Sequence, residues 1–272
     1  MAAEEGGDLQ RLLGVMADKG ANLDLVKENG CTPVFMAAQN GHHEVVRVLA
    51  DLGANLDLAD KYGRTPVYMA AARDRHEVVR ILAEKGANLD LARPRGGDRE
   101  NGWTPGYVAA YAGHHEIVRR LADNGANLDL ATKDGWTPVF VAARCGRTDV
   151  VRVLLDKGAN TDLRSKEGCI PVSLAAEQGH LETVHVLVDK GANMDLANKS
   201  GPTPLFMSVQ NGHLETVRLL ADMGADINLQ NKRGNTAVFV AAAKGHLETV
   251  RLLADMGADI NLANKRFRTP ML

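Results

Sequence analysis

Histidine is the residue of this chain with the widest chemical repertoire, because it binds metal ions and transfers protons near neutral pH. The chain holds nine, including the adjacent pairs His42-His43 and His114-His115. Five of them follow a glycine at the same place in a recurring segment: His42, His114, His180, His213 and His246. Packed helical layers lie about 10 Å apart, whereas zinc needs four ligands at about 2 Å. Because these five histidines lie one to a layer, they are too far apart to bind one metal ion, and we predict no metal site.

Carboxylates also recur, and paired carboxylates could act as a general acid and base. In four segments a carboxylate, an arginine and a second carboxylate follow at spacings of three and four: Glu44, Arg47, Asp51; Glu116, Arg119, Asp123; Asp149, Arg152, Asp156; Glu248, Arg251, Asp255. This helical spacing with an intervening arginine favours a solvated face of ion pairs. The chain has no phosphate-binding glycine loop, GxSxG elbow or HExxH motif. We expect no catalysis and no cofactor.

These residues are positioned by an internal repeat. The stretch "GHLETVRLLADMGADINL" occurs twice, beginning at Gly212 and at Gly245. One dipeptide position recurs along the chain as Thr32-Pro33, Thr65-Pro66, Thr104-Pro105, Thr137-Pro138, Ile170-Pro171, Thr203-Pro204, Thr236-Ala237 and Thr269-Pro270. Every step is 33 residues except the second, which is 39. A fixed period of this length is typical of stacked repeat architectures.

One copy is enough to predict the elements. Thr32 can cap a helix whose first residue is Pro33, where the missing amide hydrogen costs nothing. Asn40-Gly41 ends that helix, since glycine readily adopts a left-handed conformation. A second helix is predicted from His43 to Leu52, with one apolar face. The following "GANLDLADKYG" alternates and turns, which predicts an extended hairpin.

Two helices this short must pack against neighbouring units, which predicts a solenoid. The period, the frame "TPxxxAAxxGHxEVVRxLxxxGAN" and the hairpin together resemble the ankyrin repeat family over nearly the whole chain. The resemblance implies an all-α solenoid of stacked helix-turn-helix units with β-hairpin fingers. It also implies that the histidines after the glycines bridge neighbouring units by polar contacts.

The chain departs from the family at a position where the family usually carries histidine, three residues after the threonine. This position holds Phe35, Tyr68, Tyr107, Phe140, Ser173, Phe206 and Phe239. We expect aromatic packing between helices to replace the hydrogen bonding of that histidine.

We expect residues 1–272 to form a single ankyrin-repeat domain. Residues 1–31 are predicted to be an N-terminal capping half-unit, with a buried face made by Leu12, Leu13, Val15 and Met16. Residues 32–268 hold seven units, one enlarged to 39 residues by an insertion near 93–100, and 269–272 is the stub of an eighth unit. The C-terminal layer is then uncovered, which allows end-to-end association or indicates a shortened chain.

Composition limits the function classes. The 32 basic and 34 acidic residues give a net charge of −2, which argues against nucleic acid or an anionic membrane as the default partner. The chain shows no signal peptide and no apolar window of about eighteen residues. Cys31, Cys145 and Cys169 are odd in number and form no CxxC pair, which predicts reduced, structural thiols. We expect an intracellular protein, cytoplasmic or nuclear, and a monomer.

Positions that vary between copies are free to recognise a partner. In the family, partners usually meet the hairpin tips and the exposed side of the first helix. The corresponding positions hold Tyr62, Arg64, Arg73, Trp103, Tyr111, Trp136 and Arg144, and the insertion at 93–100, which either belongs to the binding face or is a solvated loop, adds Arg93 and Arg95. Tryptophan, tyrosine and arginine dominate binding hot spots. The alternative is that these aromatic residues pack on their own hairpins. The late units offer Glu177, Gln178, Pro202, Gln210, Asn211, Asn235 and Ala243 there, and are expected to be less selective.

The first hypothesis is therefore a non-catalytic scaffold that binds a protein partner through an acidic or aromatic-anchored segment. The alternatives are a structural spacer or self-assembling array, and the repeat fragment of a larger protein. Nucleic-acid binding is a weaker rival, because arginines stand beside stacking aromatic residues while the chain as a whole is slightly acidic.

Overall fold

The structure is a computed structural model of the 272-residue chain and describes residues 15, 20–92, 102–266 and 269–270. These residues form fourteen helices and no strand. The helices belong to two compact units, Met1–Lys133 and Asp134–Leu272, called unit 1 and unit 2 below.

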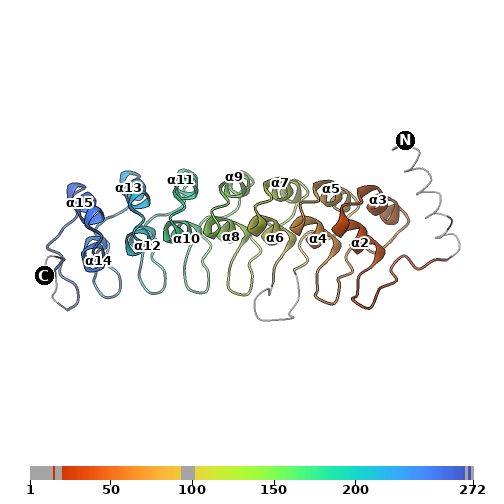
Figure 1. The fold of residues 1–272 in the computed structure, drawn as a ribbon, viewed down its shortest axis with the longest axis horizontal. Helices are drawn as coiled ribbons and strands as arrows, with labels where there is room; N and C mark the ends of the chain where they lie inside the picture. The colour runs from red at the N-terminus through yellow and green to blue at the C-terminus, as the bar shows by residue number, and fades with distance from the viewer. Residues whose placement is uncertain (1–14, 16–19, 93–101, 267–268, 271–272) are drawn as a thin grey trace. The chain divides into compact units, whose positions relative to one another are not determined.

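Both units repeat a pair of short helices. Unit 1 holds α2 (Pro33–Asn40), α3 (His43–Asp51), α4 (Pro66–Ala72), α5 (His76–Glu84), α6 (Pro105–Ala112) and α7 (His115–Asp123). Unit 2 holds α8 (Pro138–Arg144), α9 (Thr148–Asp156), α10 (Pro171–Gln178), α11 (Leu181–Asp189), α12 (Pro204–Asn211), α13 (Leu214–Asp222), α14 (Ala237–Lys244) and α15 (Leu247–Asp255). Within each unit the first helices of the pairs form one row and the second helices another (Figure 1). The predicted all-helical stack of helix pairs is confirmed.

Local chemistry explains where the helices begin and end. The Thr32 hydroxyl oxygen accepts a hydrogen bond from the Phe35 amide at 3.1 Å, and Pro33 fills the first helical position. Gly41 ends α2 with φ 84°. The predicted bounds of both helices in this repeat are confirmed to within one residue.

Side chains from both rows make the core. The first helices bury small pairs such as Ala70 and Ala71, which lets neighbouring layers approach closely. The second helices bury branched residues such as Ile81 and Leu82. The aromatic residues that replace the family's histidine are also buried, except for the partly exposed Phe239. These aromatic side chains therefore belong to the core, whereas Ser173 buries a hydroxyl that finds no partner among the described residues.

The fingers between the helix pairs are turns rather than paired strands, so the β-hairpin is not confirmed. In the finger that ends at Arg64, two main-chain bonds close the turn, from the Asp60 amide to the Arg64 carbonyl at 2.9 Å and from the Gly63 amide to the Asp60 carbonyl at 2.8 Å. The Asp60 carboxylate also accepts hydrogen bonds from the amides of Tyr62 and Arg64. The Lys61 amide donates to the Asn29 carbonyl of the preceding finger at 3.0 Å. A side chain therefore satisfies amides that a strand ladder would otherwise pair.

A second connection, the GAN segment after each second helix, links the layers by side-chain bonds. The Asp24 carboxylate accepts from the Asn55 amide at 2.9 Å, and the Asn55 side chain accepts from the Asp57 amide at 3.0 Å. The Asp57 carboxylate then accepts from the Asn88 amide of the next repeat at 2.9 Å. Unit 2 contains a ladder of the same kind, in which Asn228 takes the place of an aspartate.

The expectation for the N-terminal half-unit is wrong at Val15, which is 49% exposed instead of buried. Leu12, Leu13, Met16 and the insertion at 93–100 lie outside the described residues. No helix in the described part of the chain has the length and apolar character needed to cross a membrane.

Candidate binding surface

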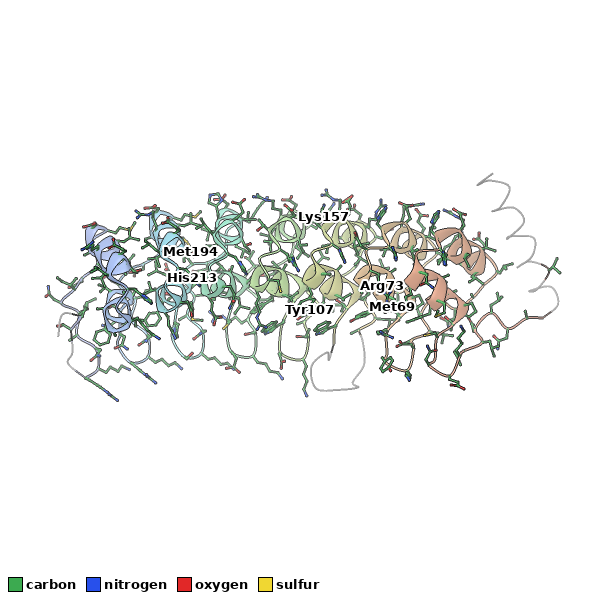
Figure 2. All side chains as sticks on the ribbon, viewed as in Figure 1. Met69, Arg73, Tyr107, Lys157, Met194 and His213 are labelled. Atoms are coloured by element: carbon green, nitrogen blue, oxygen red, sulfur yellow. The ribbon has the colours of Figure 1, made fainter. Side chains whose placement is uncertain are left out.

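Of the histidines expected to bridge layers, His180 and His213 do so in unit 2, whereas the buried Nε2 of His246 finds no hydrogen-bond partner among the described residues. His180 Nε2 lies 3.0 Å from the Arg144 carbonyl, and His213 Nε2 lies 2.9 Å from the Glu177 carbonyl. His213 stands in the turn between α12 and α13 (Figure 2). No group of three or more histidine, cysteine or acidic side chains in the described ranges could hold a metal ion.

The carboxylate–arginine stripe consists of exposed ion pairs, which confirms the solvated face. Glu116 and Glu248 pair with the arginines three residues later, each at 2.9 Å. Arg152 instead reaches Glu182 of the next repeat. In α5 the hydrogen bond from Arg80 lowers the pKa of Glu77 below its ordinary value. The second carboxylates Asp51 and Asp156 pair instead with Lys85 and Lys190 of the next repeat, so the stripe is a network of exposed ion pairs.

In unit 1, Trp103 is the centre of an aromatic group. Its ring centroid lies 4.9 Å from that of Tyr107 and 5.7 Å from that of Tyr111. Tyr107 is buried, whereas Tyr111 is 49% exposed. The group is therefore fixed to the core at one side and open to solvent at the other. Figure 2 shows Tyr107 on the row of first helices, together with Met69 and Arg73 of α4.

Tyr62 and Arg64 form a second group in unit 1. The Arg64 guanidinium lies 5.0 Å from the centroid of the Tyr62 ring, and Tyr62 is 47% exposed. Arg64 Nε also donates to Asp60 Oδ2 at 2.8 Å, and the Asp60 side chain is buried. Because this carboxylate already compensates its charge, Arg64 holds Tyr62 and the finger in place.

Arg73 follows the last residue of α4, is exposed and forms no ion pair with the described residues of unit 1. Arg93 and Arg95 lie outside the described residues.

In unit 2, Trp136 and Arg144 come together. Trp136 stacks on the buried Phe140 with ring centroids 5.6 Å apart, and the Arg144 guanidinium lies 4.8 Å from the Trp136 ring. Arg144 is exposed and makes no ion pair with the described residues of its unit, while its carbonyl accepts from His180. Two of the nine candidate positions thus form a stacked cation on an aromatic floor.

Unit 2 has two surface features that the sequence analysis did not predict, a hollow and a row of lysines. An open hollow of about 340 Å³ lies between α12 and α14, with Phe206, Phe239, Arg233 and Lys244 among its lining residues. The fingers of the same unit carry lysine at one turn position, as Lys166, Lys199, Lys232 and Lys265. The sequence signal for the lysines was their spacing of 33 residues. The hollow had no such signal, because residues from different repeats line it.

The three free cysteines fit a structural role. Burial raises the pKa of the Cys31 thiol above its ordinary value, and the neighbouring Asp60 raises it further. Burial likewise raises the pKa of Cys169. A raised pKa leaves less thiolate at neutral pH and makes both thiols poor nucleophiles.

Comparison with known proteins agrees with this architecture. A family model described as ankyrin repeats (3 copies) matches residues 1–93, 90–165 and 171–264. A search of curated proteins finds no match. Ankyrin repeats generally mediate protein–protein interaction, and ankyrin repeat proteins are typically non-enzymatic scaffolds. With the fold, the period and this match in agreement, the chain belongs to the ankyrin repeat family.

Proposed function

We propose that this chain is a non-catalytic scaffold that binds a protein partner through its fingers and first helices. The contact residues are Tyr62, Trp103, Tyr111 and Trp136 as aromatic anchors, with Arg73, Arg93, Arg95 and Arg144 favouring an acidic segment. These eight residues are called the aromatic–arginine surface below. Arg64 acts indirectly, because it positions Tyr62.

The observation that carries the proposal is the Trp103 group. Trp103 contacts the buried Tyr107 and the half-exposed Tyr111 together. Rings held this way lose little side-chain entropy when a partner covers them, and such aromatic residues dominate interface energies. An aromatic residue that only packed on its own finger would not need an exposed second ring beside it.

Arg144 adds a charge preference. Its guanidinium is stacked on Trp136 and has no ion pair within the described part of unit 2. Stacking occupies the face of the guanidinium and leaves the N–H groups at its edge available to a carboxylate.

A triple variant tests the proposal: Trp103→Ala, Trp136→Ala, Arg144→Glu. Partners retained by the wild type from a lysate are identified by mass spectrometry, and their Kd is measured for both chains after circular dichroism confirms equal helicity. We expect at least a tenfold weaker Kd for the variant, since a single hot spot contributes about 2 kcal/mol.

The matched control changes exposed residues of the second helices: Leu181→Ala, Leu247→Ala, Arg218→Glu. This variant should bind like the wild type. Equal binding by the triple variant would exclude the aromatic–arginine surface, and the absence of any partner for the wild type would favour a spacer or array element.

A further inference from the structure

The fingers of unit 2 are far more basic than the chain as a whole. Residues 164–167, 197–200, 230–233 and 263–266 contain seven basic side chains and one acidic side chain, whereas the whole chain has a net charge of −2. Four of the seven are the repeated lysines, which all lie in the same turn of their fingers: Lys166, Lys199, Lys232 and Lys265. All four are exposed.

Backbone contacts between successive fingers keep these lysines in register. The Lys166 amide donates to the Asp134 carbonyl at 2.9 Å, and the Lys199 amide donates to the Glu167 carbonyl at 3.0 Å. Lys199 Cγ would lie 3.0 Å from a Cβ on Gly168, which shows that its stem runs against the preceding finger. The Lys265 amide likewise donates to the Arg233 carbonyl at 3.1 Å, and the Lys232 backbone nitrogen lies close to Gly201 of the preceding finger.

The positive charge of the row is little compensated. Within the described part of unit 2, Lys199, Lys232 and Lys265 make no ion pair, and neither do Arg233 and Arg266. Lys166 makes one weak pair, 3.9 Å from Asp134, with both side chains exposed. Aspartates elsewhere in the repeats are engaged differently, since their carboxylates accept amide hydrogen bonds in the GAN segments.

The hollow between α12 and α14 adjoins the row, because Ser200 and Asn231 both line it and are the chain neighbours of Lys199 and Lys232. Phe206 and Phe239 give it apolar surface, and Arg233 and Lys244 add positive charge. The hollow therefore suits an apolar side chain flanked by carboxylates.

We propose that the four fingers of unit 2 bind an extended, acidic segment of a partner protein, with an apolar side chain of that segment in the hollow. Layers of packed helices lie about 10 Å apart. A segment in the extended polyproline II conformation has three residues per turn and advances about 3.1 Å per residue, so one turn spans one layer and every third side chain faces the row. The row therefore recognises carboxylates at every third position. This site uses none of the residues of the aromatic–arginine surface and does not depend on it.

A peptide fits this row better than a single-stranded nucleic acid does. Binding of single strands combines positive charge with aromatic platforms on which bases stack. The four finger segments contain no aromatic residue. Charge complementarity alone is therefore available at the tips, and it matches a row of carboxylates. The late repeats thus acquire a selectivity that the sequence positions first considered did not predict.

The test uses the full chain and labelled synthetic peptides of about 15 residues, long enough to cross four layers. One peptide carries glutamate at every third position and a central leucine. A second has the same composition with the glutamates in one block, and a third replaces the leucine by serine. Fluorescence anisotropy gives each Kd at about 50 and 200 mM salt, a range over which exposed charge pairs are increasingly screened.

The first peptide should bind the wild type at least several-fold more tightly than the other two, and more weakly at the higher salt. For the variant Lys199→Gln, Lys232→Gln, Lys265→Gln, the Kd of the first peptide should be about tenfold higher than for the wild type. A control with the same charge change on the second helices, Arg152→Gln, Arg218→Gln, Arg251→Gln, should bind it like the wild type.

Several outcomes would overturn the proposal. These are no binding of any peptide, equal loss in both variants, or equal affinity for the spaced and the blocked glutamates. Tighter binding of an oligothymidylate than of the spaced peptide would assign the row to nucleic acid instead. The Trp103, Trp136 and Arg144 variant keeps all four lysines, so its behaviour with these peptides separates failure of this site from failure of the aromatic–arginine surface.

Discussion

Asp74 is the one described residue other than glycine with a positive φ, 57°. It stands after α4, where the first repeat has Gly41 and the third has Gly113. A left-handed conformation costs a residue with a Cβ up to about 1–2 kcal/mol. Asp74→Gly should therefore raise the free energy of unfolding by about 0.5–1 kcal/mol, measured by urea denaturation.

The control for this prediction is Gly41→Ala, which should destabilise the chain. Its φ is 84°, and the new Cβ would lie 3.0 Å from Arg75 Cδ. The competing effect is electrostatic, because Asp74 Oδ1 lies 3.7 Å from His114 Nδ1. A destabilised Asp74→Gly variant would mean that this contact outweighs the backbone strain.

Asp90 gives a prediction about pH. Burial raises its pKa above the ordinary 3.8, partly offset by the hydrogen bond from the Asn127 amide. The native state thus holds this proton more readily than the unfolded chain does, so the charged carboxylate costs stability at neutral pH and the cost disappears as pH falls. Asp90→Asn keeps an acceptor oxygen, as Asn228 does in the corresponding ladder of unit 2. It should stabilise the chain by up to about 0.5 kcal/mol at pH 7.

Denaturant titrations of both chains from pH 7 downward check the sign. The difference in unfolding free energy should shrink as Asp90 becomes protonated. Asp90→Ala removes the acceptor of the Asn127 amide and should instead destabilise by about 1 kcal/mol. A gain that grows toward low pH would contradict the assignment.

At the scale of the elements, the sequence predicts α2 well because both of its boundaries have a local cause. Thr32, Pro33 and Gly41 act on their own neighbours, and the structure follows them. The fingers differ, because their hydrogen bonds go to side chains and to the preceding finger, as from Lys61 to Asn29. An alternating pattern does not distinguish such a turn from a paired strand.

On the candidate surface, too, sequence position predicts some features, whereas others depend on contacts that form only in the fold. Repeat position alone indicated Trp103 and Trp136, since both occupy one slot in successive repeats. It gave no means to see that Arg64 is engaged by a buried carboxylate, because that depends on how Asp60 turns inward. Residue type and repeat position identify which side chains can bind a partner. Ion pairs within the chain decide which of those side chains remain available to a partner.

The threonines that precede α4 and α8 give a prediction about helix capping. Thr65 Oγ1 accepts from the Tyr68 amide at 3.2 Å, but the buried Thr137 Oγ1 finds no partner within the described residues. Valine has nearly the same shape and no hydroxyl. Thr65→Val should cost about 1 kcal/mol, the usual value of a lost cap. Thr137→Val should be neutral or stabilising, because it removes an unsatisfied buried group.

Urea denaturation of the two variants under identical conditions gives the comparison. The two positions are matched, since both threonines are buried and precede a proline at the start of a first helix. Equal losses would show that Thr137 also caps α8 in solution.

At the scale of the molecule, stability in a repeat array comes from contacts between neighbours. In unit 2, α11 contacts both α9 and α13, whereas α15 contacts only α13 in the row of second helices described. Leu187 of α11 and Leu253 of α15 are both fully buried. Truncating either to alanine should cost about 2–5 kcal/mol locally, but the two losses should spread differently.

Hydrogen exchange followed helix by helix distinguishes the two cases. Leu187→Ala weakens two interfaces, so protection should fall in α9 and α13 as well as in α11. Leu253→Ala weakens one, so the loss should stay within α13, α14 and α15. If Leu253→Ala lowered protection equally from α8 to α15, unit 2 would unfold as one cooperative block, and a sum of nearest-neighbour contacts would not describe its stability. The expected gradient follows from the geometry, since a layer with two neighbours transmits its loss in both directions.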